Sequence, residues 1–362
     1  RDSVMESTIT INGRKIGPSH PVYIIAEMSA NHDQDYEKAI QIIHSMKECG
    51  ADAVKFQTYT PDTMTIDCDK QDFIIGKGTI WEGRNLHELY GEAFTPWEWQ
   101  PKLKAEAEKL GMDLFSTAYD ETSVDFLEEM DMPAYKIASF ELVDIPLLKK
   151  IAKLNKPMIM STGMATLEEI ADAVDAVKSE CNEQIVLLKC TSAYPAPPED
   201  MNLRTIPDMI KRFNCPIGLS DHSLDSNVPL TAVKLGACVV EKHYTLSRSK
   251  VGPDSAFSLE PEELATMIKN IRSGELGELD EVILGKVNYE PSEKESKSLP
   301  FRRSLYAVED IAEGEEFTSK NVRSIRPANG LPPKEIDNVI GKEASENIER
   351  GTALKRELIA SA

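Results

Sequence analysis

Short apolar runs alternate with amphipathic helical patterns along most of the chain, and this alternation limits the possible folds most strongly. The runs lie at residues 22–26, 53–56, 113–115, 134–137, 158–160, 185–188, 217–219 and 238–240. Helical patterns lie between them, for example at 36–48, 101–110, 167–178 and 229–235, and another at 261–271 follows the last run. Strands that are apolar throughout are buried on both faces, which is typical of a parallel sheet covered by helices.

Eight strand–helix repeats in about 250 residues predict a (β/α)8 TIM barrel. A doubly wound open sheet is the structural alternative, but no run is followed by a GxGxxG turn. Before the barrel, Asn12-Gly13 between alternating residues indicates a β-hairpin. We therefore expect an N-terminal hairpin flap at residues 1–20, the barrel at 21–280, a polar linker at 281–298, and a small β-rich domain at 299–362.

The formal net charge of −20 argues against binding to nucleic acid or to an anionic membrane surface. No apolar run approaches the roughly 18 residues that span a bilayer, and the first ten residues lack a signal-peptide pattern. The six cysteines include no CxxC pair, which favours reduced thiols and a cytoplasmic protein. An anionic substrate would need lysines and arginines gathered locally against the negative background.

Polar residues follow the apolar runs at their carboxyl ends, where barrels of this type carry their chemistry. They are Glu27, Lys55, Gln57, Ser116, Thr117, Lys136, Ser139, Ser161, Ser192, Tyr194, Ser220, His222, Glu241 and His243. Polar loops are ordinary in themselves. Because every strand end carries such residues, the sequence predicts one shared active site.

His222 and His243 follow adjacent strands, so their rings can converge on one point. Neutral imidazoles suit Mn, Fe, Zn or Co, and two of them would leave positions open for water and substrate oxygens. The alternative is that each histidine only hydrogen-bonds a backbone or loop group. No further Cys or His lies nearby, which disfavours a closed tetrahedral zinc site.

Lys55 and Lys136 are expected to point into the site and to hold a phosphate or carboxylate group. Two alternatives remain open for them. One is a structural ion pair with Glu27 or Glu141, and the other is a Schiff-base role. The Ser161-Thr162-Gly163 segment opens a helix whose N-terminal amides would also favour an anion.

Several motifs occur in order along nearly the whole chain and resemble the sialic acid synthase family. They are Lys55-Phe56-Gln57, Lys136-Ile137-Ala138-Ser139, Ser161-Thr162-Gly163-Met164, Ser220-Asp221-His222, Glu241-Lys242-His243 and Gly252-Pro253-Asp254. The C-terminal unit, with Arg326-Pro327 and Asn329-Gly330, is similar to that family's antifreeze-like (SAF) domain. Lys189-Cys190-Thr191-Ser192 stands where N-acetylneuraminate synthases usually carry His-Cys-Thr-Asn, and the chain is more similar to the pseudaminic acid branch.

The resemblance implies condensation of phosphoenolpyruvate with an acetamido-hexose, expected to be 2,4-diacetamido-2,4,6-trideoxy-L-altrose, to give pseudaminic acid and phosphate. The expected catalytic residues are Glu27, Lys55, Lys136, Glu241 and Asp254. Phosphoenolpyruvate would bind Lys55, Gln57, Lys136, Ser139, Ser161 and Ser220. The sugar would contact Ser192, Tyr194, Asp254 and Arg326. His222 and His243 would bind Mn²⁺ or Mg²⁺.

The resemblance also implies a domain-swapped homodimer in which Arg326 lies over the sugar site of a partner's barrel. The long 58–94 segment is typical of a lid. Trp81, Arg84 and Tyr90 within it, and Trp97 and Trp99 just after it, are the candidate lid residues. Helix-start packing is the alternative for the last two. Other functions stay open: an N-acetylneuraminate or legionaminic acid synthase, a Schiff-base aldolase using Lys136, or an inactive carbohydrate-binding protein.

Overall fold

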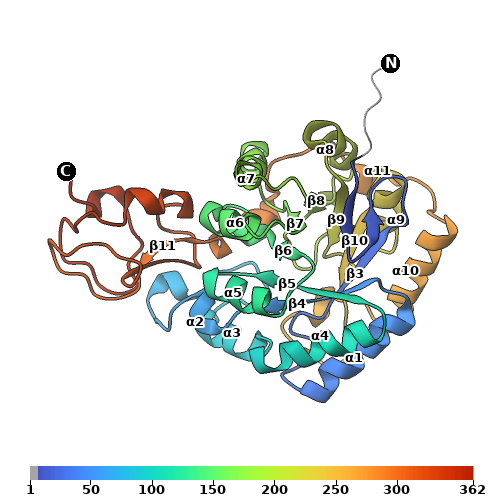
Figure 1. The fold of residues 1–362 in the computed structure, drawn as a ribbon, viewed down its shortest axis with the longest axis horizontal. Coiled ribbons are helices and arrows are strands. Elements are labelled where there is room, and N and C mark those ends of the chain that lie inside the picture. Colours follow the sequence, from blue (N-terminus) through green and yellow to red (C-terminus); the bar gives the residue numbers. More distant parts are fainter. Residues whose placement is uncertain (1–6, 362) are drawn as a thin grey trace.

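The structure is a computed structural model that describes residues 7–361. Residues 1–6 of the predicted flap, and residue 362, lie outside the described residues. In the described part, eight parallel strands form a closed barrel, because the last strand pairs with the first (Figure 1). The strands are β3 (Tyr23–Glu27), β4 (Ala53–Thr58), β5 (Asp113–Ala118), β6 (Tyr135–Ile137), β7 (Met158–Ser161), β8 (Ile185–Cys190), β9 (Ile217–Asp221) and β10 (Val239–His243). This confirms the predicted (β/α)8 barrel.

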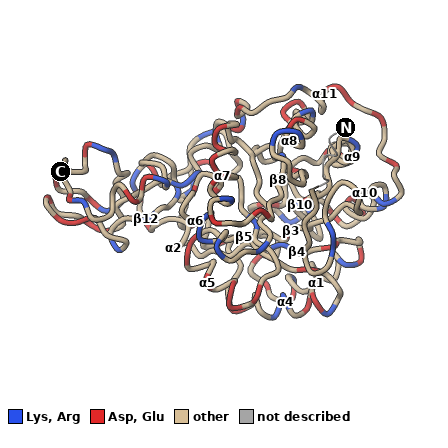
Figure 2. The backbone as a smooth tube through the Cα atoms, turned by 45° about the horizontal axis from the view of Figure 1, so that its top comes forward, with Lys and Arg blue, Asp and Glu red and all other residues tan. Residues whose placement is uncertain are grey.

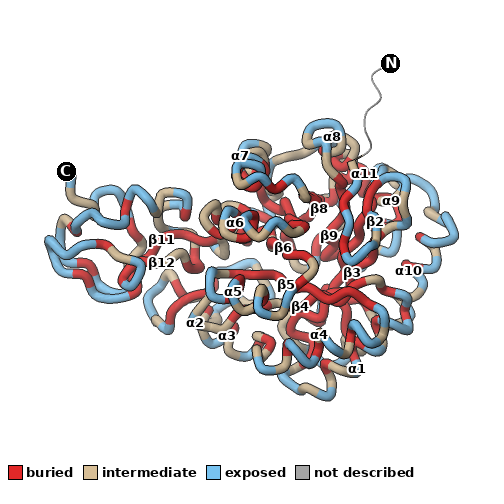
Figure 3. Tube along the Cα trace, viewed as in Figure 1, coloured by how far each residue is buried: buried red, intermediate tan, exposed pale blue. Residues whose placement is uncertain are grey.

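Helices cover the outside of the barrel, one after each strand. They are α1 (Tyr36–Cys49), α4 (Gln100–Lys109), α5 (Glu121–Glu129), α6 (Ile145–Ala152), α7 (Leu167–Ser179), α8 (Thr205–Phe213), α9 (Asn227–Lys234) and α10 (Pro261–Ser273). The long connection after β4 adds α2 (Pro61–Met64) and α3 (Leu86–Ala93). The strands are buried on both faces while the helices keep an exposed side, as Figure 3 shows.

Local sequence fixes where helices begin and end. The side chain of Asp35 accepts a hydrogen bond from the Lys38 amide and so caps the start of α1. Gly50 ends the same helix with φ of 98°, a left-handed conformation that glycine adopts without steric cost. The predicted helix limits agree with the observed ones to within about two residues, the precision expected for such boundaries.

The N-terminal hairpin, β1 (Ile9–Ile11) and β2 (Arg14–Ile16), closes the end of the barrel opposite the carboxyl ends of the strands. Asn12 donates a hydrogen bond to Asp113 at 3.0 Å, and Arg14 forms ion pairs with Asp52 and Asp113 at 3.4 and 3.2 Å. Both carboxylates lie where strands begin. The hairpin therefore leaves the other end of the barrel open for a site.

The segment that we predicted as a linker contains two short helices, α11 (Glu281–Leu284) and α12 (Glu293–Ser296), and packs onto the barrel. The C-terminal domain follows, and its strands β11 (Ser304–Ala307) and β12 (Val322–Ile325) pair antiparallel. Its own core gathers around Leu305, Phe317 and Val339. In Figure 1 this domain projects to one side of the barrel.

Acidic and basic residues are interspersed over the outer helices and the small domain, and charged residues also occur on barrel strands such as β3, β4 and β10 (Figure 2). Charges inside a barrel are costly unless they are paired. No helix among residues 7–361 is long and apolar enough to cross a membrane.

Candidate active site

A cavity of about 140 Å³ lies at the carboxyl ends of the barrel strands and collects most of the predicted site residues. Those that line it are Lys55, Gln57, Lys136, Ser139, Ser161, Tyr194, Ser220, His222, Glu241, His243, Asp254 and Arg326. Their convergence follows from strand geometry, because side chains two residues apart on a strand face the same side. Lys55 and Gln57 of β4 share the inner face in this way, as do Glu241 and His243 of β10.

Two lysines and two glutamates form a buried charged cluster at the base of this cavity. The Lys55 ammonium lies 3.2 Å from Glu27 and 3.4 Å from Glu241, and the Lys136 ammonium lies 3.4 Å from Glu241. Burial favours neutral forms, but the flanking lysines Lys136 and Lys55 outweigh it and hold the pKa of Glu241 well below its usual range. The same carboxylates overcome the effect of burial on Lys55 and raise its pKa.

Lys136 differs from Lys55 because burial sets the net direction of its pKa shift. Burial lowers the pKa of the Lys136 amine, and the nearby Glu241 carboxylate offsets this only in part. For the Glu27 carboxyl group, burial raises the pKa, and Lys55 offsets this increase only in part. The cluster thus has capacity for an added anion, which would stabilise the charged form of Lys136.

Several buried polar atoms around the cavity have no hydrogen-bond partner within residues 7–361. They include Glu27 Oε2, Ser161 Oγ and His243 Nδ1. Such orphaned groups cost stability unless a ligand, ion or water satisfies them. Their gathering at one place indicates that the cavity is built for a polar ligand.

The two predicted imidazoles do converge, with ring centroids 5.2 Å apart. His222 Nδ1 lies 3.1 Å from the Thr191 carbonyl oxygen, a contact that leaves its Nε2 as the other available atom. Burial, followed by the charge of His222, lowers the pKa of His243 well below its usual value, so His243 stays neutral. Two imidazoles at this separation fit a shared divalent cation, which would bind their deprotonated nitrogens. Residues 7–361 contain no group of three or more His, Cys, Asp or Glu that could form a complete protein cage.

Aromatic side chains from the loops form the outer part of the cavity. Tyr194 lies with its ring centroid 4.4 Å from that of His222 and 5.1 Å from that of Phe257. Trp81 packs against Tyr194 and donates a hydrogen bond to the Pro253 carbonyl at 3.2 Å. The cavity therefore has a charged base and an aromatic entrance.

Two predicted site residues do not line the cavity. Glu27 is fully buried beside Lys55 and accepts a hydrogen bond from Gln57 at 2.8 Å. Ser192 is fully buried next to the loop that follows β7. Asp254 does line the cavity, and its carboxylate accepts hydrogen bonds from Ser29 and from the Ala30 amide.

The candidate lid divides into two groups. Trp81 and Tyr90 line the cavity. The other three do not, because Trp97 stacks on Phe126, Trp99 packs against His32 and Tyr36, and Arg84 pairs with Glu92. Trp97 and Trp99 therefore pack at the start of α4, as the alternative interpretation predicted.

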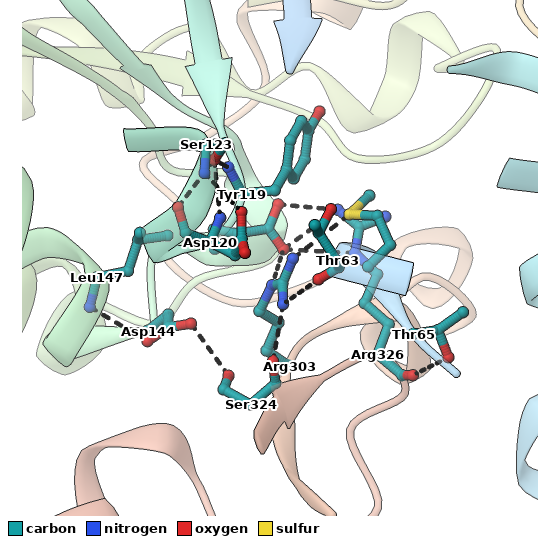
Figure 4. A network of polar contacts seen from close by, with 12 residues as sticks. Thr63, Thr65, Tyr119, Asp120, Ser123, Asp144, Leu147, Arg303, Ser324 and Arg326 are labelled. Carbon is teal, nitrogen blue, oxygen red and sulfur yellow. Dashed lines mark hydrogen bonds and ion pairs between the residues drawn. The ribbon is translucent and has the colours of Figure 1, made fainter. Parts of the chain in front are cut away.

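In the single chain, Arg326 reaches the cavity of its own barrel. Its expected position over a partner's barrel stays a prediction. Its guanidinium contacts Glu141 at 2.8 Å and the Tyr90 hydroxyl at 3.0 Å, and it lies 4.7 Å from the ring centroid of Phe140. Arg303 binds the same Glu141 carboxylate at 3.3 Å. Figure 4 shows these arginines where the small domain meets the barrel, with Ser324 donating to Asp144 alongside. In the single chain, the C-terminal domain docks through these contacts.

Some residues of the site carried no sequence signal that we used. Tyr59, Tyr119, Phe257 and Phe301 line the cavity, the first three from loops of the barrel and Phe301 from the start of the C-terminal domain. Tyr59 and Tyr119 directly follow strands β4 and β5, so reading one residue further past each strand would have found them. Phe301 has no such marker, since only tertiary packing brings the start of the C-terminal domain to the cavity.

A parallel eight-stranded barrel with an enclosed, charged cavity at the carboxyl ends of its strands defines the chain as a barrel enzyme. Residues 42–279 match the NeuB family, and residues 302–360 match the SAF domain. The chain belongs to the NeuB family.

Relatives with assigned activities support this membership. The chain is 46% identical over 334 residues to pseudaminic acid synthase of Campylobacter jejuni, covering 92% of this chain and 95% of that protein. It is 37% identical over 360 residues to N,N'-diacetyllegionaminic acid synthase of Legionella pneumophila, covering 97% and 98%. Among solved structures, the spore coat polysaccharide biosynthesis protein SpsE of Bacillus subtilis superposes with a TM-score of 0.85 at 32% identity, covering 98% of this chain and 100% of that one.

Proposed function

We propose that this chain is a nonulosonic acid synthase that condenses phosphoenolpyruvate with 2,4-diacetamido-2,4,6-trideoxy-L-altrose to give pseudaminic acid and phosphate. The observation that carries the proposal is the division of one cavity into a charged base and an aromatic entrance. The base suits a small phosphorylated carboxylate, and the entrance suits a sugar whose deoxy carbon and acetamido methyl groups are apolar.

At the base, Lys55 and Lys136 would neutralise the phosphate and carboxylate of phosphoenolpyruvate, with hydroxyl donors from Ser139, Ser161 and Ser220. Ser161 Oγ has no partner among the described residues and is free to donate. The lowered pKa of Lys136, caused by burial, would rise when an anion binds, and this supports a role for Lys136 in anion binding.

In the reaction, C3 of phosphoenolpyruvate forms a bond to the aldehyde carbon of the open-chain sugar. Water then adds to C2, and the C–O bond to phosphate breaks. Glu27 is proposed to orient that water or take its proton, which the unpartnered Oε2 and the raised pKa caused by burial both support. Tyr194, Ser192 and Asp254 are proposed to position the sugar, Asp254 through its cavity-lining carboxylate.

His222 and His243 would hold Mn²⁺ or Mg²⁺, and the convergence of the two rings together with the lowered pKa of His243 supports this role. When bound, the ion supplies Lewis-acid polarisation of the aldehyde oxygen. The protein's own part is to orient both rings, and the Thr191 carbonyl does this for His222. Glu241 would hold the reacting groups through Lys55 and Lys136.

A phosphate-release assay with a panel of acetamido sugars tests the proposal. The altrose derivative should give the highest kcat/KM, and EDTA should abolish turnover until Mn²⁺ is restored. Preference for the epimer used by legionaminic acid synthases, or for N-acetylmannosamine, would move the chain to another branch. The similarity to the Legionella enzyme makes the first of these the principal alternative.

A Schiff-base aldolase is a second candidate because a lysine whose pKa is lowered by burial, as for Lys136, is a better nucleophile. Borohydride trapping of a pyruvyl adduct on Lys136, with activity retained in EDTA, would favour this candidate. A synthase predicts no adduct.

We further propose that the chain works as a homodimer in the cytoplasm. Exposed apolar side chains on loops at the cavity face, among them Ile80, Leu224 and Val251, would be covered by a second copy. The described cysteines are free thiols, which suits a reducing compartment. Mixing R326A with H243A chains tests domain exchange, since activity returns only if Arg326 serves the partner's cavity.

A further inference from the structure

The segment between the two matched regions contributes buried polar groups near the site. Glu295 of α12 and Ser298 are 4% and 3% exposed, although both lie in a stretch whose composition is strongly polar. The family matches end at residue 279 and resume at residue 302, so neither match covers them. A buried carboxylate needs compensating donors. For Glu295 these donors are backbone amides of two barrel loops.

Glu295 joins two loops of the barrel through one oxygen. Its Oε2 accepts a hydrogen bond from the Met164 amide at 2.8 Å and another from the Ser192 amide at 2.9 Å. Met164 follows β7 and Ser192 follows β8. Ser298 Oγ donates to the Ser192 carbonyl at 2.7 Å, so the linker holds both backbone polar groups of Ser192. Hydrogen bonds to an ionised carboxylate are roughly twice as strong as neutral ones.

Close packing carries this restraint to the cavity. The Gly163 amide donates to Ser139 Oγ at 3.0 Å. A Cβ at Gly163 would lie 2.1 Å from Ser192 Oγ and 2.8 Å from Ser139 Oγ, so the three residues leave no spare room. Met164 has φ of 54°, a conformation that is unfavourable for a residue other than glycine and that must be held by its surroundings.

We propose that Glu295 is a positioning residue that fixes the phosphoenolpyruvate end and the sugar end of the cavity relative to each other. Ser139 belongs to the first end, while Ser192 and the following Tyr194 belong to the second. Glu295 holds the loops that join them and does not line the cavity itself. The inference rests on the proposed function for the assignment of the two ends.

Three variants separate positioning from simple helix capping. E295A removes all contacts of the carboxylate. E295Q keeps an amide oxygen that can accept from Met164 and Ser192. S292A is the matched control, because Ser292 Oγ caps the same short helix through the Glu295 amide at 3.1 Å and does not reach either barrel loop.

We expect E295A to lower kcat/KM for the sugar by about 10- to 100-fold, since displacement of about 1 Å can cost that much. E295Q should restore most of the activity, and S292A should stay within about twofold of the wild type. Equal losses in E295A and S292A would overturn the inference. If E295A does not fold, S298A carries the test, with an expected fall of about two- to tenfold in the same parameter; unchanged kinetics would then overturn it.

The rate of amide hydrogen exchange in the two loops tests the positioning role of Glu295 independently of the proposed function. E295A should speed exchange in residues 163–166 and 190–194 together, and S292A should not. If the wild type releases no phosphate from phosphoenolpyruvate with any sugar, the proposed function fails and exchange alone decides the positioning role. Unchanged exchange at both loops in folded E295A would overturn that role.

Discussion

Arg326 and Arg303 share one carboxylate, Glu141, but only Arg326 lines the cavity, and this difference allows a sharp test. Arg326→Ala removes contacts to Glu141 at 2.8 Å and to the Tyr90 hydroxyl at 3.0 Å. Breaking one side of a buried ion pair costs about 3–5 kcal/mol. Because Arg303 still neutralises Glu141, we expect a loss at the lower end, about 3 kcal/mol.

The kinetic effect should be selective. A lost hydrogen bond from a charged donor to the sugar corresponds to about 1.5–3 kcal/mol, or roughly a 10- to 100-fold rise in the KM of the sugar. The KM of phosphoenolpyruvate should change by about threefold or less, since its proposed ligands lie at the base of the cavity. Arg303→Ala is the control: it should lose comparable stability, because it also donates to the Ser324 carbonyl at 2.8 Å, without the change in sugar KM.

Urea denaturation followed by circular dichroism measures the stability of both variants, and phosphate release at saturating phosphoenolpyruvate measures the sugar KM. Equal effects of the two substitutions on sugar KM would mean that Arg326 only docks the small domain. An unchanged sugar KM in folded Arg326→Ala would refute the reasoning for a sugar contact.

Three further predictions concern single groups. Burial raises the pKa of Asp144 to about 6 from its usual 3.8. The contribution of Asp144 to the free energy of unfolding should therefore fall as the pH rises from about 4 to about 6, by about 3 kcal/mol at most. Asp144→Asn should flatten this part of the stability–pH curve in urea titrations, and an unaltered curve would contradict the assignment. His243→Ala should lose Mn²⁺ binding in calorimetry and lower kcat at least about 100-fold with an unchanged fold; full activity in metal-free buffer would exclude the metal role. Lys136→Met should raise the KM of phosphoenolpyruvate about 10- to 100-fold while leaving that of the sugar near its wild-type value; the reverse pattern would reassign the base of the cavity.

The barrel and most of the cavity lining could be predicted from sequence because both follow local rules. Apolar runs mark strands, and alternation places Lys55 and Gln57, or Glu241 and His243, on one face of a strand. The carboxyl ends of parallel strands then meet at one end of the barrel.

The remaining features depend on contacts between distant segments. Glu141 meets Arg303 and Arg326 across more than 160 positions, and nothing in the local pattern of any of them indicates a partner. The linker was predicted from its polar composition, which conceals the buried Glu295. Composition reports average exposure, whereas a single buried carboxylate is determined by the amides that surround it.

The most direct test of the central claim uses phosphoenolpyruvate labelled with ¹⁸O at the oxygen that bridges C2 and phosphorus. If the cavity directs water to C2 after carbon–carbon bond formation, the C–O bond breaks and the label leaves with phosphate. Mass spectrometry of the released phosphate should therefore find the label there. Label retained in the sugar acid would show cleavage of the P–O bond and would contradict the account.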